Sequence, residues 1–111
     1  MKKIIFLCHG NICRSPMAEF MFKNMVKEKG VAQDFYIESA ATSREEIGND
    51  MHYGAKEVLR KHGIPFERRA ARQMTMEDYR KFDYIICMDS MNLRNVNRII
   101  GEDTLGKVSR L

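Results

Sequence analysis

The residues best able to do chemistry lie in one run near the N-terminus, Cys8-His9-Gly10-Asn11-Ile12-Cys13-Arg14-Ser15-Pro16. This run follows the short apolar stretch at residues 4–7, which is typical of a buried strand. A turn from a strand into a helix can aim successive backbone N–H groups at one oxyanion. Arg14 can add a bidentate, charge-assisted contact to the same anion. Cys8 would lie at the base of this cradle as a thiolate held by the same positive field. The run therefore predicts a nucleophile that attacks phosphorus.

The context of the run makes the cysteine–arginine spacing more specific. Gly10 and Asn11 are the residue types that most readily adopt left-handed backbone angles. Ser15 is expected to be the N-cap of the following helix, with Pro16 at its first position.

Strands and helices alternate along the rest of the chain. Strands are expected at residues 3–8, 35–39, 84–88 and 108–111. A helix is expected at residues 16–29, with Met17, Ala18, Met21, Phe22, Met25 and Val26 on its inner stripe. Asp50 is expected to cap a second helix that ends at Gly63, and Thr75 and Asp78 a short third one. A fourth helix, capped by Asp89, ends at Gly101. This alternation predicts an α/β fold with a parallel sheet.

The run from Cys8 to Pro16, with Ala18-Glu19 after it, resembles the signature loop of the low-molecular-weight protein tyrosine phosphatases. The similarity continues through the rest of the chain, in Ser39-Ala40-Ala41-Thr42-Ser43, Gly48, His62-Gly63-Ile64, Ala71-Arg72-Gln73 and Ile86-Cys87-Met88-Asp89. The resemblance implies a single domain over residues 1–111 with a four-stranded parallel sheet of order 2-1-3-4 and helices on both faces. A final helix after the fourth strand would be needed to complete one face. We therefore expect the domain to be C-terminally incomplete, lacking that helix.

The resemblance also implies roles for individual residues. Cys8 would form a phosphocysteine intermediate, Arg14 would bind the phosphate, and Ser15 would donate a hydrogen bond to the Cys8 thiolate. Asn11 and Ser39 would support the loop, and Cys13 would form a reversible disulfide with Cys8 under peroxide. The backbone of the loop would bind the phosphate through His9, Gly10, Asn11, Ile12, Cys13 and Arg14. The general acid of the family, an Asp in an Asp-Pro loop, is not expected among these residues, because the only prolines are Pro16 and Pro65.

The chain departs from the family pattern at two positions. Arg69 stands where many members carry a histidine that supports the asparagine–serine network, and Glu45 stands at a rim position that is often aromatic. Ile12 is bulkier and more apolar than the threonine of relatives that act on phosphoarginine, and so favours an aromatic phosphoester. The substrates expected are phosphotyrosine proteins or small aryl phosphates.

Three other functions are compatible with parts of the sequence. A thioredoxin-coupled arsenate reductase has a similar loop, but it needs relay cysteines near the third strand, where only Cys87 is found. A catalytically inactive phosphate-binding domain would explain the missing acid. A cysteine-phosphorylated sugar-transport subunit has a similar loop but does not use an arginine such as Arg14.

Composition limits the partners. A net charge of +4 suits anionic substrates, but the 15 acidic residues are interspersed and no basic block indicates nucleic acid. Three cysteines, an odd number, favour reduced thiols in the cytoplasm over a disulfide framework. No stretch is long enough to span a membrane, and the histidines and cysteines do not have metal-site spacing. We expect no cofactor, and self-association through the uncovered sheet face is a further expectation.

Overall fold

The computed structural model describes all residues 1–111 and contains one four-stranded sheet. Its strands are β1 (Lys2–Cys8), β2 (Phe35–Ala41), β3 (Tyr84–Cys87) and β4 (Val108–Arg110). All neighbouring strands are parallel, in the order β2-β1-β3-β4. This confirms the predicted α/β fold and the 2-1-3-4 order.

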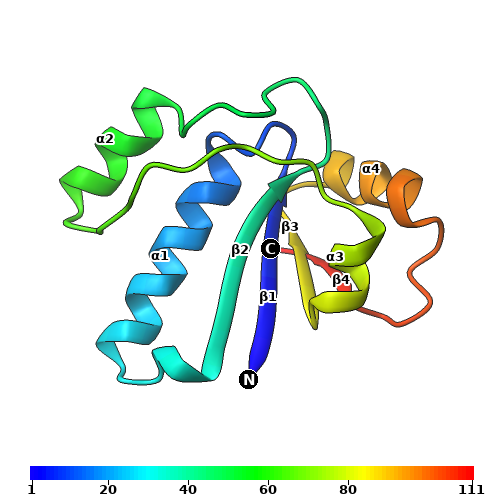
Figure 1. Cartoon of the computed structure of the whole chain (residues 1–111), viewed down its shortest axis with the longest axis horizontal. Coiled ribbons are helices and arrows are strands. Elements are labelled where there is room, and N and C mark those ends of the chain that lie inside the picture. Colours follow the sequence, from blue (N-terminus) through cyan, green and yellow to red (C-terminus); the bar gives the residue numbers. More distant parts are fainter.

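Helices cover both faces of the sheet, as predicted. They are α1 (Arg14–Glu28), α2 (Tyr53–Lys61), α3 (Met76–Lys81) and α4 (Ser90–Ile100), with a short 3-10 turn, η1 (Ala32–Asp34), before β2. In Figure 1, α1 lies on one side of the sheet, and α3 and α4 lie on the other. The helix α2 is stacked on the outer side of α1 and does not reach the sheet.

The core divides between the two faces because successive strand residues point in opposite directions. The face under α3 and α4 holds the largest cluster, in which Ile5 and Leu7 of β1 meet Ile85 and Cys87 of β3. On the opposite face, Ile4 and Phe6 pack against Val26 of α1. A third cluster, with Phe20 and Leu59 at its centre, joins α1 to α2.

Both predicted capping residues of the second half of the chain are present. Thr75 and Asp78 form a reciprocal capping box at the start of α3. Asp89 caps α4, with Asn92 completing the box. These caps satisfy helix-end N–H groups and fix where each helix begins.

The predicted starts of the first two helices were wrong. The helix α1 begins at Arg14, and its N-cap residue Cys13 makes no side-chain cap, so Ser15 lies inside the first turn. The cap of α2 is His52, whose side chain accepts from the Gly54 N–H, and not Asp50. Asp50 instead bonds the side chain of Lys56 at 2.7 Å. In both cases the polar side chain bonds a group other than the expected helix N–H. Ser15 Oγ accepts from Asn11 Nδ2 at 2.8 Å, and Asp50 Oδ1 accepts from the Arg69 N–H at 3.2 Å.

The predicted inner stripe of α1 was also wrong in part. Met21 and Met25 are 44% and 50% exposed, whereas Phe20 and Val26 are buried. The reason is that α1 packs against two surfaces, the sheet through Phe22 and Val26 and α2 through Phe20.

No helix of this structure is both long enough and apolar enough to cross a lipid bilayer.

Candidate active site

The predicted loop lies at the carboxyl edge of the sheet, where β1, β2 and β3 all end. Cys8 is the last residue of β1 and is buried. The segment after β2 continues alongside the loop, because the N–H groups of Thr42 and Ser43 donate to the carbonyls of Cys8 and His9, both at 3.0 Å. Figure 1 shows this segment passing next to the turn between β1 and α1. The start of the loop is therefore held by β2 as well as by its own strand.

Asn11 determines the shape of the loop. It has a φ of 59° and is the only non-glycine residue with a positive φ. Its side chain is completely buried, and its Nδ2 donates to Ser15 Oγ at 2.8 Å and to Ser39 Oγ at 2.9 Å. Its Oδ1 accepts from the Arg69 guanidinium and, at 3.3 Å, from the Arg72 N–H. Four hydrogen bonds thus hold a backbone conformation that an L residue rarely adopts.

Gly10 serves a different purpose from the one predicted. Its φ is not positive, so only one of the two expected left-handed residues is left-handed. A Cβ at this position would lie 3.1 Å from Glu46 Cγ, which is tighter than ordinary van der Waals contact. Gly10 therefore allows the segment after β2 to approach the loop closely.

The hydroxyl of Ser15 lies between the candidate nucleophile and the supporting network. Its Oγ is 3.0 Å from Cys8 Sγ and accepts from Asn11 Nδ2. Because a thiolate has no proton, a charged Cys8 can only accept from this hydroxyl. Ser15 makes this contact from inside the first turn of α1.

Arg14 lies at the first position of α1 and bonds the side chain of Asp89. Its Nη1 is 2.7 Å from Asp89 Oδ2, and both side chains are about half exposed. The hydrogen bond with Arg14 holds the pKa of the Asp89 carboxyl below its usual range. Nη1 makes this contact, and the guanidinium has further N–H donors at Nη2 and Nε.

The remaining predicted loop residues lie at its exposed side. His9 is exposed, and its Nε2 is 3.0 Å from Glu45 Oε2, so the rim residue that departs from the family pattern contacts the loop directly. Cys13 is an exposed free thiol. Ile12 is half-buried, and its carbonyl accepts from the His52 N–H at 2.6 Å, which ties the loop to the start of α2.

Sequence reasoning missed the supporting roles of Glu19 and Arg72. Ser39 Oγ donates to Glu19 Oε1 at 2.6 Å, and Lys23 Nζ bonds the other oxygen of this buried carboxylate. The Arg72 N–H reaches Asn11 from 61 residues away. Arg69, singled out only as a departure from the family pattern, reaches the same oxygen from 58 residues away. A signal existed for Glu19, because it is an acidic residue among the apolar side chains of α1.

Arg69 is a half-buried cation behind the loop. Burial lowers the pKa of its guanidinium, and the charges of Glu19, Asp50 and Cys8 oppose that effect. A guanidinium remains protonated in proteins, so the Arg69 side chain that bonds Asn11 keeps its positive charge while the protein is folded.

Cys87 lies apart from this chemistry. It is completely buried in β3, and burial raises the pKa of its thiol to about 12. A thiol in this state is a poor nucleophile.

Comparison with known proteins agrees with this geometry. Residues 3–111 match the family described as low molecular weight phosphotyrosine protein phosphatase. The human protein of that name is 47% identical over 97 residues, which are 87% of this chain and 61% of the human one. The crystal structure of YfkJ from Bacillus subtilis superposes with a TM-score of 0.95 and 39% identity, covering 99% of this chain and 69% of YfkJ. A low molecular weight protein tyrosine phosphatase from Streptococcus pyogenes superposes with a TM-score of 0.92 and 40% identity, covering 99% of this chain and 71% of that one.

The parallel sheet carries a cysteine-containing loop between β1 and α1, and the chain belongs to the low molecular weight phosphotyrosine protein phosphatase family. It spans 61% of the length of the human relative.

Proposed function

We propose that the chain is the catalytic part of a protein tyrosine phosphatase that works through a phosphocysteine intermediate. The observation that carries the proposal is the Asn11-locked loop, with Cys8 and Ser15 in contact at its base and Arg14 at its edge. Family membership supports the same conclusion.

In the first step, Cys8 Sγ attacks phosphorus in line with the leaving oxygen, so the S–P bond forms as the P–O bond to the aryl group breaks. Backbone N–H groups of residues 9–14 and the Arg14 guanidinium bind the equatorial oxygens, on which the transition-state charge is spread. In the second step, water attacks phosphorus and the S–P bond breaks. The returning electron pair makes Cys8 a thiolate again, and the Ser15 hydroxyl 3.0 Å away donates to it.

The substrate class proposed is phosphotyrosine in proteins, together with small aryl phosphates. The apolar side chain of Ile12 supports an aromatic phosphoester, and no step of the proposed mechanism requires a metal or a cofactor. We place the reaction in the cytoplasm, where the three free cysteines would stay reduced. Cys13 is proposed as the residue that reduces peroxide together with Cys8, which yields a disulfide and two waters.

Arsenate reduction with a cysteine relay is less well supported. Cys87, the one cysteine near the third strand, is buried with a raised pKa and cannot readily act as a relay.

The main test compares two variants. Cys8→Ser should abolish turnover of an aryl phosphate and keep binding of orthophosphate, because the cradle and Arg14 bind whereas only sulfur attacks. Arg14→Ala should lose both. Turnover is measured by phosphate release, and binding by calorimetry. Appreciable turnover by Cys8→Ser would exclude the covalent mechanism.

A second test concerns the leaving group. No Asp-Pro pair occurs in the chain. In the proposed mechanism, no carboxylate of the chain protonates the departing oxygen. General acid catalysis contributes about 10²–10⁴-fold, so the chain should favour esters of acidic phenols strongly over phosphotyrosine. A series of aryl phosphates should show rates that fall steeply with the pKa of the phenol. A flat series with full phosphotyrosine activity would require an acid within these residues, and Glu45 would be the first to replace.

A further inference from the structure

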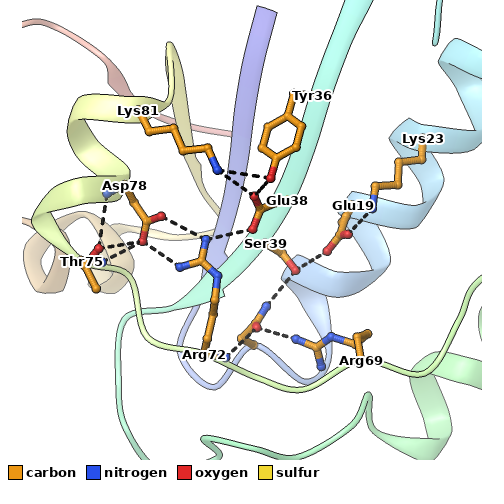
Figure 2. A network of polar contacts seen from close by, with 11 residues as sticks. Glu19, Lys23, Tyr36, Glu38, Ser39, Arg69, Arg72, Thr75, Asp78 and Lys81 are labelled. Atoms are coloured by element: carbon orange, nitrogen blue, oxygen red, sulfur yellow. Dashed lines mark hydrogen bonds and ion pairs between the residues drawn. The ribbon is translucent and has the colours of Figure 1, made fainter. Parts of the chain in front are cut away.

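A second polar network is centred on the guanidinium of Arg72. Figure 2 shows this group between two carboxylates, Asp78 from α3 and Glu38 from β2. Its Nη1 and Nη2 donate to the two oxygens of Asp78 at 2.8 and 3.0 Å, and Nη2 also donates to Glu38 Oε1 at 3.1 Å. We call Glu38, Arg72 and Asp78 the Arg72 clamp. It joins a helix to an edge strand, through a bidentate contact with Asp78 and a single hydrogen bond to Glu38.

The Arg72 clamp is fully charged at neutral pH. Burial raises the pKa of Asp78, but hydrogen bonds from Arg72 and Thr75 outweigh it and hold that pKa below its usual range. Burial likewise raises the pKa of Glu38, and its bonds with Tyr36 and Arg72 bring it below its usual range. Asp78 and Glu38 are therefore carboxylates and pair with the Arg72 cation.

The clamp and the loop-supporting residues lie on opposite faces of β2. Glu38 is paired in register with Ile5 and lies on the face under α3, whereas Ser39 is paired with Phe6 and bonds Glu19 of α1. Figure 2 shows Ser39 and Arg69 on one side of β2 and the Arg72 guanidinium with Asp78 on the other.

Residues 69–74 connect the two sides. This segment belongs to no helix or named strand, and only Gln73 forms an isolated bridge, with Ala41. Both donors to Asn11 Oδ1, the Arg69 guanidinium and the Arg72 N–H, come from it. The carbonyl of Arg72 accepts from the Ala41 N–H at 2.7 Å. Several side chains of the segment are held in place. Gln73 Nε2 donates to the Thr42 carbonyl at 3.4 Å, and Met74 is buried in the core. The guanidinium of Arg72 is the side chain that joins the segment to both α3 and β2, through the Arg72 clamp.

We propose that the three residues of the Arg72 clamp are positioning residues for the phosphate-binding loop. They touch no substrate. They fix residues 69–74, which hold the carboxamide of Asn11 and thereby its left-handed backbone. Without this anchor, the Asn11 oxygen loses fixed donors, and a conformation that is costly for an L residue relaxes. The N–H groups of the loop would then no longer converge on one anion. The proposal rests on the proposed function in one respect, that the loop binds phosphate.

The test uses Asp78→Asn, which keeps the size of the side chain and removes its charge. The matched control is Glu77→Gln, one residue earlier on α3, whose carboxylate pairs only with exposed Arg80. The first measurement is hydrogen exchange of the Asn11 side-chain amide by NMR in the ligand-free chain. The second is the dissociation constant of inorganic phosphate. Asp78→Asn should accelerate the exchange and weaken phosphate binding, each by roughly tenfold, within the ~10²-fold that lost positioning can cost. Glu77→Gln should change neither.

A double-mutant cycle with Asn11→Gly distinguishes positioning of Asn11 by the Arg72 clamp from a general effect of the clamp on fold stability. Glycine adopts a positive φ freely but has no carboxamide, so the clamp has nothing left to hold. In this background Asp78→Asn should not weaken phosphate binding further. The proposal would be overturned if Asp78→Asn weakened phosphate binding equally in the parent and Asn11→Gly backgrounds. It would also be overturned if Asp78→Asn lowered the melting temperature and left the exchange of the Asn11 amide unchanged. If Asp78→Asn does not fold, Glu38→Gln breaks the other arm and is subject to the same criteria.

The two proposals fail in different ways. A parent chain that binds no phosphate contradicts the proposed function, whereas the exchange measurement tests the Arg72 clamp without any ligand.

Discussion

The contact between Ser15 and Cys8 gives a prediction that distinguishes a direct effect of Ser15 on the Cys8 sulfur from its support of the Asn11 side chain. Ser15 Oγ contacts both Cys8 Sγ and Asn11 Nδ2, whereas Ser39 Oγ bonds Asn11 Nδ2 but no sulfur. Replacing either serine by alanine removes one acceptor from the same buried amide. Only the first replacement removes a donor from the cysteine.

The two variants should lose similar stability. A buried donor left without its acceptor costs about 1–3 kcal/mol, and each kcal/mol lowers the melting temperature of a domain near this size by about 4–8 °C. Ser39→Ala should lose at least as much as Ser15→Ala, because Glu19 also loses a donor. Thermal unfolding followed by circular dichroism measures both.

Their kinetics should differ. A hydrogen bond to a charged group contributes about 1.5–3 kcal/mol, which corresponds to about 10- to 150-fold in rate. In the proposed mechanism, breakdown of the phosphocysteine regenerates the thiolate, so Ser15→Ala should slow this step by that factor and leave phosphoenzyme accumulated. Ser39→Ala should accumulate none. Rapid-quench experiments with a phosphorus-labelled aryl phosphate measure the covalent intermediate. Equal accumulation in the two variants would show that the serines act through loop shape alone, and the role given to Ser15 would be wrong.

Three further predictions concern thiols, acid stability and association. Iodoacetamide at pH 8 should modify Cys8 first, and phosphate should protect it. Cys87 should stay unmodified because burial raises the pKa of its thiol to about 12. Peptide mass spectrometry measures the labelling, and labelled Cys87 in the folded protein would contradict the prediction. The pKa of Asp50 is lowered to about 2 by its bond with Lys56, so its contribution to stability is present above about pH 4 and is lost as the pH falls toward 2. Asp50→Asn should therefore flatten the acid-unfolding curve in that window, and an unchanged slope would refute the assignment. Half-buried Ile86 lies on the face of the sheet that packs against α1, beside exposed Tyr84. This apolar surface should promote self-association of the chain, and Ile86→Glu should abolish it. Sedimentation velocity measures it, and a monomer at all concentrations would exclude it.

Much of the fold could be predicted because its signals are local. The apolar run before Cys8 and the alternation of strand and helix patterns predicted a parallel α/β sheet, since a strand buried on both faces is continuously apolar. The capping pairs Thr75–Asp78 and Asp89–Asn92 are separated by three residues each, so their helix starts follow from short-range hydrogen bonds. The helix starts at Ser15 and Asp50 were wrong because other groups bond these side chains: Ser15 Oγ bonds Asn11, and Asp50 bonds Lys56 and the Arg69 N–H.

The candidate site divides in the same way. Local sequence was enough to single out the proposed nucleophile, the arginine proposed to bind the anion and the tight turn, because Cys8, Asn11 and Arg14 are neighbours in the chain. Ser39 was expected to support this turn only from the family resemblance, and the hydrogen bonds that hold the Asn11 carboxamide became visible in the folded chain. The two donors to the Asn11 oxygen come from a segment about 60 residues away, and the Arg72 clamp behind it joins β2 to α3. Hydrogen bonds between segments so far apart follow from strand order and register, which bring Ser39 beside the loop and Glu38 to the opposite face, and no local pattern encodes them.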